Sequence, residues 1–215
     1  MAVVTVSRQY GAGGSSVATV VARRLGAEVL DKKLIEQVAA RLAMEPEEVE
    51  QEEERPRTLL EKMVRSFGAF EPPMGSGWSP PYPDPLFDPR KEILELTEQV
   101  VREAASAGNV VIVGRGAGFI LKELPDLLRV FLWAPEPDRI RTLMARFGFT
   151  EAVARRKMHE TDANRAAYMR QVYGADWTEV SNYDLVLNTG CLGYDAAADA
   201  ITLALKSVAA KSSVA

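Results

Sequence analysis

The chain has 215 residues, a length that suits one domain with small insertions, and 47% of them are hydrophobic and 26% charged, as in many soluble enzymes. Its formal net charge of −4 argues against a general nucleic-acid-binding protein, which usually carries a basic face. A single cysteine, Cys191, and a single histidine, His159, exclude an intramolecular disulfide and a multi-histidine metal site. The sequence begins without a signal-peptide pattern, and no apolar run approaches the roughly 20 residues that span a bilayer. We therefore expect a cytoplasmic protein that binds neither nucleic acid nor a membrane.

Short runs rich in β-branched residues alternate with helix-length amphipathic segments along the chain. Strands are predicted at 3–6, 28–30, 110–113, 129–133 and 185–187. Helices are predicted after the first strand up to residue 25, and at 32–42, 90–107, 136–147, 150–172 and 194–208. This alternation predicts an α/β fold in which a five-stranded parallel sheet lies between two layers of helices. In such sheets ligands bind beyond the carboxyl ends of the strands.

The stretch between the second and third predicted strands is far longer than the roughly 10–12 residues that a crossover needs. Within an insertion at 45–90, an acidic run at 45–54 is interpreted as a solvated helix face, and a helical pattern follows at 57–67. The arm at 69–89 is rich in proline and aromatic residues, which predicts irregular structure. Three roles for this arm stay open: a lid over a substrate, a contact between the subunits of a homodimer, or a loop without a specific role. The chain 1–215 is otherwise read as a single domain.

A glycine-rich segment at 7–16, with the sequence Ser-Arg-Gln-Tyr-Gly-Ala-Gly-Gly-Ser-Ser, follows the first predicted strand and opens a helix. Such a loop aims several backbone N–H groups and the positive end of the helix dipole at one point. Glycines let the backbone approach an anion without a Cβ contact, and the serine hydroxyls suit a phosphate or, at Ser15, a Mg²⁺ ion. The segment predicts a nucleotide phosphate site, with a purely structural turn as the alternative. The predicted contacts are Gly11, Ala12, Gly13, Gly14, Ser15 and Ser16.

The segment departs from the P-loop consensus G-x-x-x-x-G-K-S/T. When Gly13 is set on the second consensus glycine, Arg8 stands at the first glycine and Gly14 at the lysine. The lysine that reaches the β- and γ-phosphates is therefore missing. The nearest cation is Arg8, which could replace the lysine in part, although a guanidinium is a donor of a different shape.

Further segments stand in a fixed order: 30–33 (Leu-Asp-Lys-Lys), 113–116 (Val-Gly-Arg-Gly), 162–165 (Asp-Ala-Asn-Arg) and 183–189 (Tyr-Asp-Leu-Val-Leu-Asn-Thr). Together with the loop at 7–14 they resemble the cytidylate kinases, and more closely the cytidylate-kinase-like family of P-loop nucleotide kinases. The resemblance covers about 2–205 apart from the proline-rich arm. It implies a three-layer P-loop kinase-type sandwich with a helical lid at 150–175. It also implies ATP and Mg²⁺ as cofactors, and transfer of the ATP γ-phosphate to CMP, dCMP or another small phosphate acceptor.

Phosphoryl transfer depends on positioning and charge neutralisation, for which arginine is suited because its planar fork binds two phosphate oxygens. Arg115 follows the third predicted strand, so we expect it at the carboxyl edge of the sheet near the acceptor phosphate. Helical spacing places Arg155, Asp162 and Arg165 within one arc of the segment 150–172. The two arginines are predicted to close on the transferring phosphate, with Asp162 orienting one of them. The alternative is a solvated helix with charge pairs.

Two residues after the second predicted strand are candidates for substrate contacts. The Asp31 carboxylate could hold a ribose hydroxyl or a cytosine amino group, cap the helix that follows, or do both. Lys32 is predicted to contact the acceptor phosphate, with a solvated lysine as the alternative.

The sequence also departs from the cytidylate kinases at charged positions. Gly14 replaces the phosphate-loop lysine, Val113 and Gly116 replace two aspartates, and Gln37 stands where an arginine is expected. Each lost charge-assisted contact lowers a rate by about tenfold to a hundredfold. Two functions therefore stay open: a nucleotide kinase, and a nucleotide-binding regulatory module with little or no kinase activity. The retained arginines favour the kinase, since a pure sensor needs no transition-state clamp.

Overall fold

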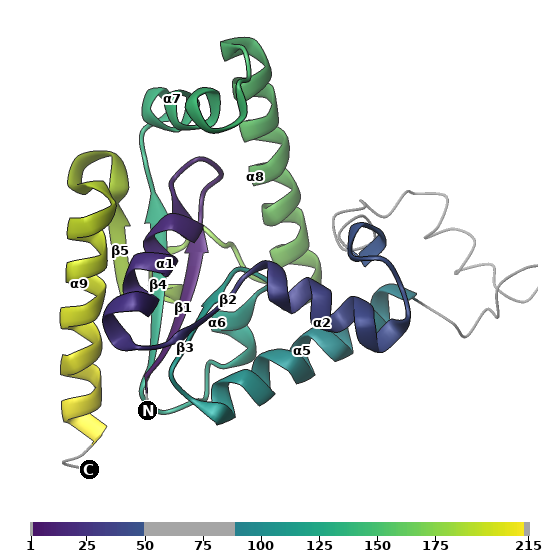
Figure 1. Ribbon diagram of the computed structural model, residues 1–215, viewed down its shortest axis with the longest axis vertical. Helices are drawn as coiled ribbons and strands as arrows, with labels where there is room; N and C mark the ends of the chain where they lie inside the picture. Colours follow the sequence, from purple (N-terminus) through teal and green to yellow (C-terminus); the bar gives the residue numbers. More distant parts are fainter. Residues whose placement is uncertain (1, 50–88, 213–215) are drawn as a thin grey trace, which may run out of the picture.

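The computed structural model describes residues 2–49 and 89–212 (Figure 1). Most of the predicted insertion, including the proline-rich arm and any dimer contact that it makes, lies outside the described residues. The strands are β1 (Val3–Arg8), β2 (Glu28–Leu30), β3 (Val110–Val113), β4 (Leu127–Trp133) and β5 (Leu185–Asn188). The helices are α1 (Gly14–Leu25), α2 (Lys32–Leu42), α5 (Pro89–Ala107), α6 (Ala117–Ile120), α7 (Glu136–Phe147), α8 (Glu151–Tyr173) and α9 (Thr189–Ser212), with a 3₁₀ helix η1 (Val180–Asn182).

The five strands form one sheet in the order β2-β3-β1-β4-β5, and every pair is parallel. This confirms the predicted fold class. Strand β1 lies in the middle, where Val3 pairs with Val110 of β3 on one side and with Leu127 of β4 on the other. From β1 the chain passes to the edge strand β2, and after β3 it crosses β1 to reach β4 on the other side. The glycine-rich segment after β1 therefore lies near the switch in strand order, where α/β sheets bind ligands.

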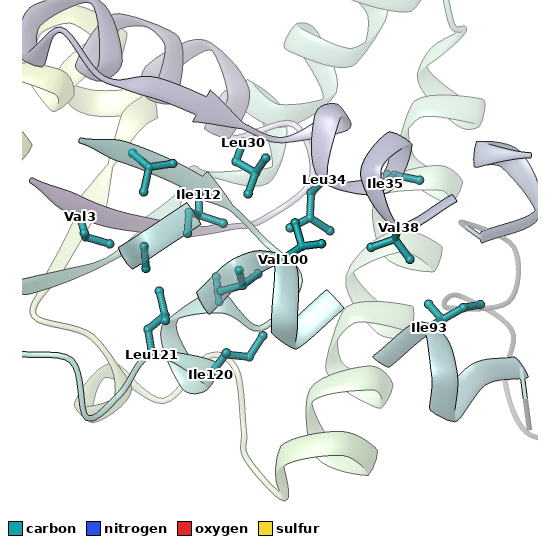
Figure 2. Packing of buried hydrophobic residues seen from close by; sticks show 14 of the residues in the cluster. Val3, Leu30, Leu34, Ile35, Val38, Ile93, Val100, Ile112, Ile120 and Leu121 are labelled. Atoms are coloured by element: carbon teal, nitrogen blue, oxygen red, sulfur yellow. The ribbon is translucent and has the colours of Figure 1, made fainter. Parts of the chain in front are cut away.

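Helices cover both faces of the sheet, which explains why the strands read as continuous apolar runs such as the Val-Val-Ile-Val of β3. Helices α2, α5 and α6 cover one face, where Leu34, Val38, Ile93 and Ile112 belong to one buried cluster (Figure 2). Helices α1 and α9 cover the other face. The buried cluster there includes Ile201 of α9.

Helix α7 and the first part of α8 stand beyond the carboxyl ends of the strands in Figure 1. They pack together through a small buried cluster of Ile140, Leu143, Ala154 and Met158, against which Tyr10 of the glycine-rich segment packs. Near its carboxyl end α8 joins a second cluster through Met169, which contacts residues around β4. Helix α8 thus packs against α7 near its start and against β4 near its end.

Two features of the structure differ from the expected elements. Helix α6 was not predicted, because it has only four residues and follows a turn rather than an amphipathic pattern. Helix α9 begins at Thr189 instead of residue 194, and its helical conformation is interrupted at Gly193, where φ is 72°. Among the helices that the structure describes, none has the length and apolar character needed to cross a membrane.

Candidate active site

A cavity of about 940 Å³ opens at the carboxyl edge of the sheet, between the glycine-rich segment, α2, α7 and α8. Residues from distant parts of the sequence line it together. The predicted site residues among them are Arg8, Gly11, Gly13, Gly14, Ser15, Ser16, Asp31, Lys32, Arg115 and Arg165. Three other predicted residues, Ala12, Asp162 and Arg155, do not line the cavity.

The glycine-rich segment has a backbone that requires glycine at two positions. Gly11 and Gly13 have φ values of 86° and 77°, in the left-handed region that side chains disfavour. A Cβ at Gly11 would lie 2.9 Å from the carbonyl oxygen of Arg139, and one at Gly13 would overlap the ring of Tyr194. The loop is therefore held between α7 and the start of α9, with no space for side chains.

Ala12 is buried behind the loop and contributes to its shape. Its N–H group donates to the Gln9 carbonyl at 3.2 Å. Its carbonyl accepts a hydrogen bond of 2.9 Å from the Thr189 hydroxyl. Both backbone groups of Ala12 are thus bonded within the protein, and they stabilise the conformation of the loop.

The side chain of Arg8 lies across two glycines at the floor of the cavity. A Cβ at Gly14 would lie 2.5 Å from the Arg8 Cγ atom, and one at Gly114 would overlap its guanidinium. The Arg8 Nη2 atom is 3.9 Å from the Asp31 Oδ1 atom. The aliphatic part of the Arg8 side chain thus occupies the space at Gly14, where the P-loop consensus has its lysine, and the guanidinium lies over Gly114.

Ser15 and Asp31 form a direct pair beside the loop. The Ser15 hydroxyl donates to the Asp31 Oδ2 atom at 2.6 Å. Asp31 occupies the N-cap position of α2, but its side chain caps no backbone N–H group, so the helix-cap alternative for this residue is wrong. A hydroxyl and a carboxylate are the hard oxygen ligands that Mg²⁺ prefers, and Mg²⁺ usually takes only one or two carboxylates in addition to water and substrate phosphates. Among the described residues no group of three or more His, Cys, Asp or Glu side chains could hold a metal.

Helices α7 and α8 are tied to the glycine-rich segment through Asp162. Its carboxylate accepts a hydrogen bond of 2.8 Å from the Tyr10 N–H group and a further bond from the Arg139 guanidinium. Arg139 also donates to the Tyr10 carbonyl at 3.2 Å. Arg139 is only 7% exposed, and the sequence reasoning missed it. The available signal was its place next to Ile140 on the buried face of α7.

Arg165 extends this connection to the floor of the cavity. Its Nη1 atom donates to the Arg8 carbonyl at 2.8 Å and lies 3.8 Å from the Asp162 Oδ1 atom. The guanidinium also lies 5.8 Å from the centroid of the Tyr10 ring. Arg165 therefore reaches the loop that is predicted to bind phosphate.

The structure does not bring Arg155 to the cavity. Its side chain is 48% exposed and pairs with Glu151 at 2.9 Å and with Glu136. Hydrogen bonding by Glu151 is the largest cause that raises the pKa of Arg155. Arg155 and Arg165 share one arc of the helix, but the step of ten residues from one to the other corresponds to about 15 Å along its axis. The prediction from helical spacing considered only the angle around the helix axis and did not consider this separation along it.

We expect Arg165→Ala to lower the kcat of the predicted phosphoryl transfer at least about a hundredfold, because it removes a cation that is predicted to contact the transferring phosphate. The matched variant Arg155→Ala also removes one arginine from α8, and we expect it to lower kcat less than about threefold. Steady-state kinetics on both variants measures the difference. Equal losses would contradict the placement of these residues.

Arg115 lies in a sharp turn between β3 and α6. Gly114, Arg115 and Gly116 all have positive φ values, of 78°, 54° and 67°. This turn ends the strand and places Arg115 at the lining of the cavity. A Cβ at Gly116 would overlap the ring of Tyr173, so the turn packs directly against the carboxyl end of α8.

Aromatic residues form the wall of the cavity on the side of α8. Tyr168, Trp177 and Tyr183 line it, and the Tyr183 hydroxyl donates to the Trp177 carbonyl at 2.6 Å. Burial raises the pKa of Tyr183, and it raises the pKa of Tyr173 to about 12. These phenols therefore stay neutral. The sequence reasoning did not place them in the site, because aromatic residues at helical spacing usually pack in a core.

Comparison with known proteins identifies the family of this chain. Residues 3–190 match the family described as the Cytidylate kinase-like family. A cytidylate kinase of Methanopyrus kandleri is 38% identical over 96 residues, which are 41% of this chain and 50% of the relative. The cytidylate kinase of Pyrobaculum aerophilum is 27% identical over 207 residues, which are 95% of this chain and 91% of the relative. The match thus spans about half the length of the first relative and most of the second.

Two solved structures share the fold. An uncharacterized protein from Eubacterium ventriosum superposes with a TM-score of 0.69 at 20% identity, over 96% of this chain and 99% of that chain. The protein TT1252 from Thermus thermophilus superposes with a TM-score of 0.50 at 19% identity, over 98% of this chain and 97% of that chain. At these identities the superpositions concern the fold alone. The family match covers most of the sequence, and the parallel sheet with its glycine-rich loop agrees with it, so this chain belongs to the Cytidylate kinase-like family.

Proposed function

We propose that this protein is a nucleotide kinase that transfers the γ-phosphate of ATP to a cytidylate-like acceptor such as CMP or dCMP. The observation that carries the proposal is the gathering of Arg8, Lys32, Arg115 and Arg165 around one cavity beside the glycine-rich loop. A binding module needs the loop alone. Several cations around the same space suit a reaction in which negative charge on a moving phosphoryl group must be neutralised.

In the proposed reaction an oxygen of the acceptor phosphate forms a bond to the γ-phosphorus. The bond from the γ-phosphorus to its bridging oxygen breaks, and that oxygen leaves with its electron pair on ADP. Backbone N–H groups of the loop and the Arg8 guanidinium bind the donor phosphates, while Arg165 neutralises the group in transfer. Arg115 and Lys32 bind the acceptor phosphate. Ser15 and Asp31 would hold Mg²⁺, which would supply further charge neutralisation.

A second function, a nucleotide-binding regulatory module with little or no kinase activity, is favoured by one contact. The Asp162 carboxylate already accepts a hydrogen bond from the Tyr10 N–H group in the loop, so an acidic side chain holds one donor that a phosphate could use. In a module of this kind, nucleotide binding would exchange that contact without any chemical step.

The kinase proposal is tested by ADP formation from MgATP with CMP, dCMP, UMP, AMP and GMP as acceptors, together with calorimetric titration of ATP. We expect turnover with CMP or dCMP to exceed turnover with the purine nucleotides. Arg165→Ala purified in parallel controls for contaminating kinases, because it should lose the activity. Binding of ATP without turnover on any acceptor would contradict the kinase and support the regulatory module.

A further inference from the structure

Two charged side chains hold the backbone of one residue in the glycine-rich segment, Tyr10, at both its N–H group and its carbonyl. The Asp162 carboxylate of α8 accepts a hydrogen bond of 2.8 Å from the Tyr10 N–H group. The Nη1 atom of Arg139, on α7, donates to the Tyr10 carbonyl at 3.2 Å and also to the Asp162 carboxylate. The side chains of Arg139 and Asp162 are only 9% and 18% exposed. Since a buried ion pair is costly to open, the pair holds the Tyr10 backbone in one orientation.

The direction of a backbone carbonyl fixes the direction of the N–H group in the same peptide unit. Every peptide bond in the described part of the chain is trans, so the two groups of each unit point in opposite directions. In the unit between Gln9 and Tyr10 both groups are bonded, since the Gln9 carbonyl accepts from the Ala12 N–H group. In the next unit the Tyr10 carbonyl is bonded to Arg139, and the Gly11 N–H group forms no hydrogen bond with any described residue. Arg139 thus sets the direction of an N–H group that a ligand can use.

Gly11 lines the cavity, whereas Arg139 is buried behind the loop and does not line it. The two residues are in direct contact, because a Cβ at Gly11 would lie 2.9 Å from the Arg139 carbonyl oxygen and 3.0 Å from its Cβ atom. Gly11 has a φ of 86° and no side chain to restrict rotation of the peptide unit before it. The hydrogen bond from Arg139 supplies that restriction. Arg139 therefore acts through the loop and not by contact with a ligand.

We propose that Arg139 is a positioning residue that aims the Gly11 N–H group at a phosphate of the bound nucleotide. This inference rests on the proposed function, because it takes ATP as the ligand of the glycine-rich loop. With the Tyr10 carbonyl held, the N–H group points in one direction before the anion arrives, and a donor fixed in advance needs no reorganisation on binding. Without Arg139 the unit between Tyr10 and Gly11 can rotate, and the phosphate loses one charge-assisted hydrogen bond.

The test is Arg139→Met in the full-length protein, which keeps an apolar stem and removes the hydrogen-bond donors. We expect calorimetric titration to show ATP binding weakened about tenfold to a hundredfold, as for the loss of one hydrogen bond to a charged group, and CMP binding weakened less than about threefold. The conservative variant Arg139→Lys should bind ATP at least about threefold more tightly than Arg139→Met. Both bonds come from one nitrogen of Arg139, and an ammonium group can donate to two acceptors.

A second variant separates positioning from stability. Arg139→Met removes the shorter of the two ion pairs that Asp162 forms and should unfold at a lower temperature than the wild type. Arg139→Met/Asp162→Asn removes the buried charge as well and keeps an acceptor for the Tyr10 N–H group. It should unfold at a higher temperature than Arg139→Met, while ATP binding stays weak. The double variant also gives the ATP result if the single variant does not fold.

These titrations need no turnover, which separates this inference from the kinase proposal. The assignment of Arg139 would be overturned by unchanged ATP binding in Arg139→Met, by equal weakening for ATP and CMP, or by Arg139→Lys binding ATP no better than Arg139→Met. Recovery of ATP affinity together with stability in the double variant would show a purely structural role, and a wild type that does not bind ATP would also overturn the assignment. Wild-type binding of ATP without turnover on any acceptor would contradict the kinase alone, and the titrations would still decide the role of Arg139.

Discussion

The double variant Arg8→Gly/Gly14→Lys is expected to keep ATP-dependent activity within about tenfold of the wild type, although each single replacement loses far more. Together the two replacements restore the consensus G-x-x-x-x-G-K-S in this loop. Arg8→Gly alone removes the cation that we propose binds the donor phosphates, which should lower kcat/KM for ATP about a hundredfold. Gly14→Lys alone places a side chain where the Arg8 Cγ atom lies, 2.5 Å from the new Cβ, and should displace Arg8 from the floor of the cavity.

The prediction follows because a side chain at position 14 would occupy the same space as the Arg8 side chain. Gly14 begins α1, and the three atoms nearest to a Cβ added there all belong to the Arg8 side chain. Removal of Arg8 opens that space, and the lysine can then extend toward the phosphates. The control Arg8→Gly/Gly14→Ala has the same backbone changes without the new charge and should stay as weak as Arg8→Gly. The hypothesis that Arg8 replaces the consensus lysine would be refuted by a double variant no more active than this control. An Arg8→Gly variant as active as the wild type would also refute it.

Gly13→Ala is expected to weaken ATP binding more than about a hundredfold. The left-handed backbone at Gly13 costs an alanine about 1–2 kcal/mol, and the new Cβ would also overlap the Tyr194 ring. Either the ring or the loop must move, and displacement of the loop removes the N–H groups from a phosphate. The loss of two charge-assisted hydrogen bonds is sufficient for the expected change. Calorimetric titration of ATP measures it.

A control variant at Gly26, at the other end of α1, separates the effect of the left-handed backbone from the effect of steric overlap with the Tyr194 ring. Gly26 ends α1 with a φ of 60°, and a Cβ added there meets nothing within 4 Å. Gly26→Ala should therefore lower the free energy of unfolding by about 1–2 kcal/mol and leave ATP affinity unchanged. Gly13→Ala/Tyr194→Ala should regain stability relative to Gly13→Ala, because the overlapping ring is gone. An unchanged affinity for ATP in Gly13→Ala would contradict the role of the loop as a phosphate site.

The strands could be predicted from local sequence because of where they lie. A parallel strand covered by helices on both faces must be apolar throughout, so the runs at 3–6 and 110–113 are strong signals. The four residues of α6 and the interruption of α9 at Gly193 have no such pattern. They depend on tight turns, whose conformation is decided by what packs against them, as Tyr173 packs against Gly116.

The sequence by itself determined the alternation of strands and helices, the place of the glycine-rich loop after the first strand, and the arginines that stand near strand ends. These features are local, since burial and backbone conformation act on neighbouring residues. The tertiary structure alone decided which side chains meet. It pairs Asp31 with Ser15, and joins Arg165 to the Arg8 carbonyl across 157 residues, while Arg155 turns to nearby glutamates. These contacts depend on how the helices pack over the edge of the sheet. This packing decides which residues along a helix reach the site, whereas the sequence pattern indicates only which side of the helix they lie on.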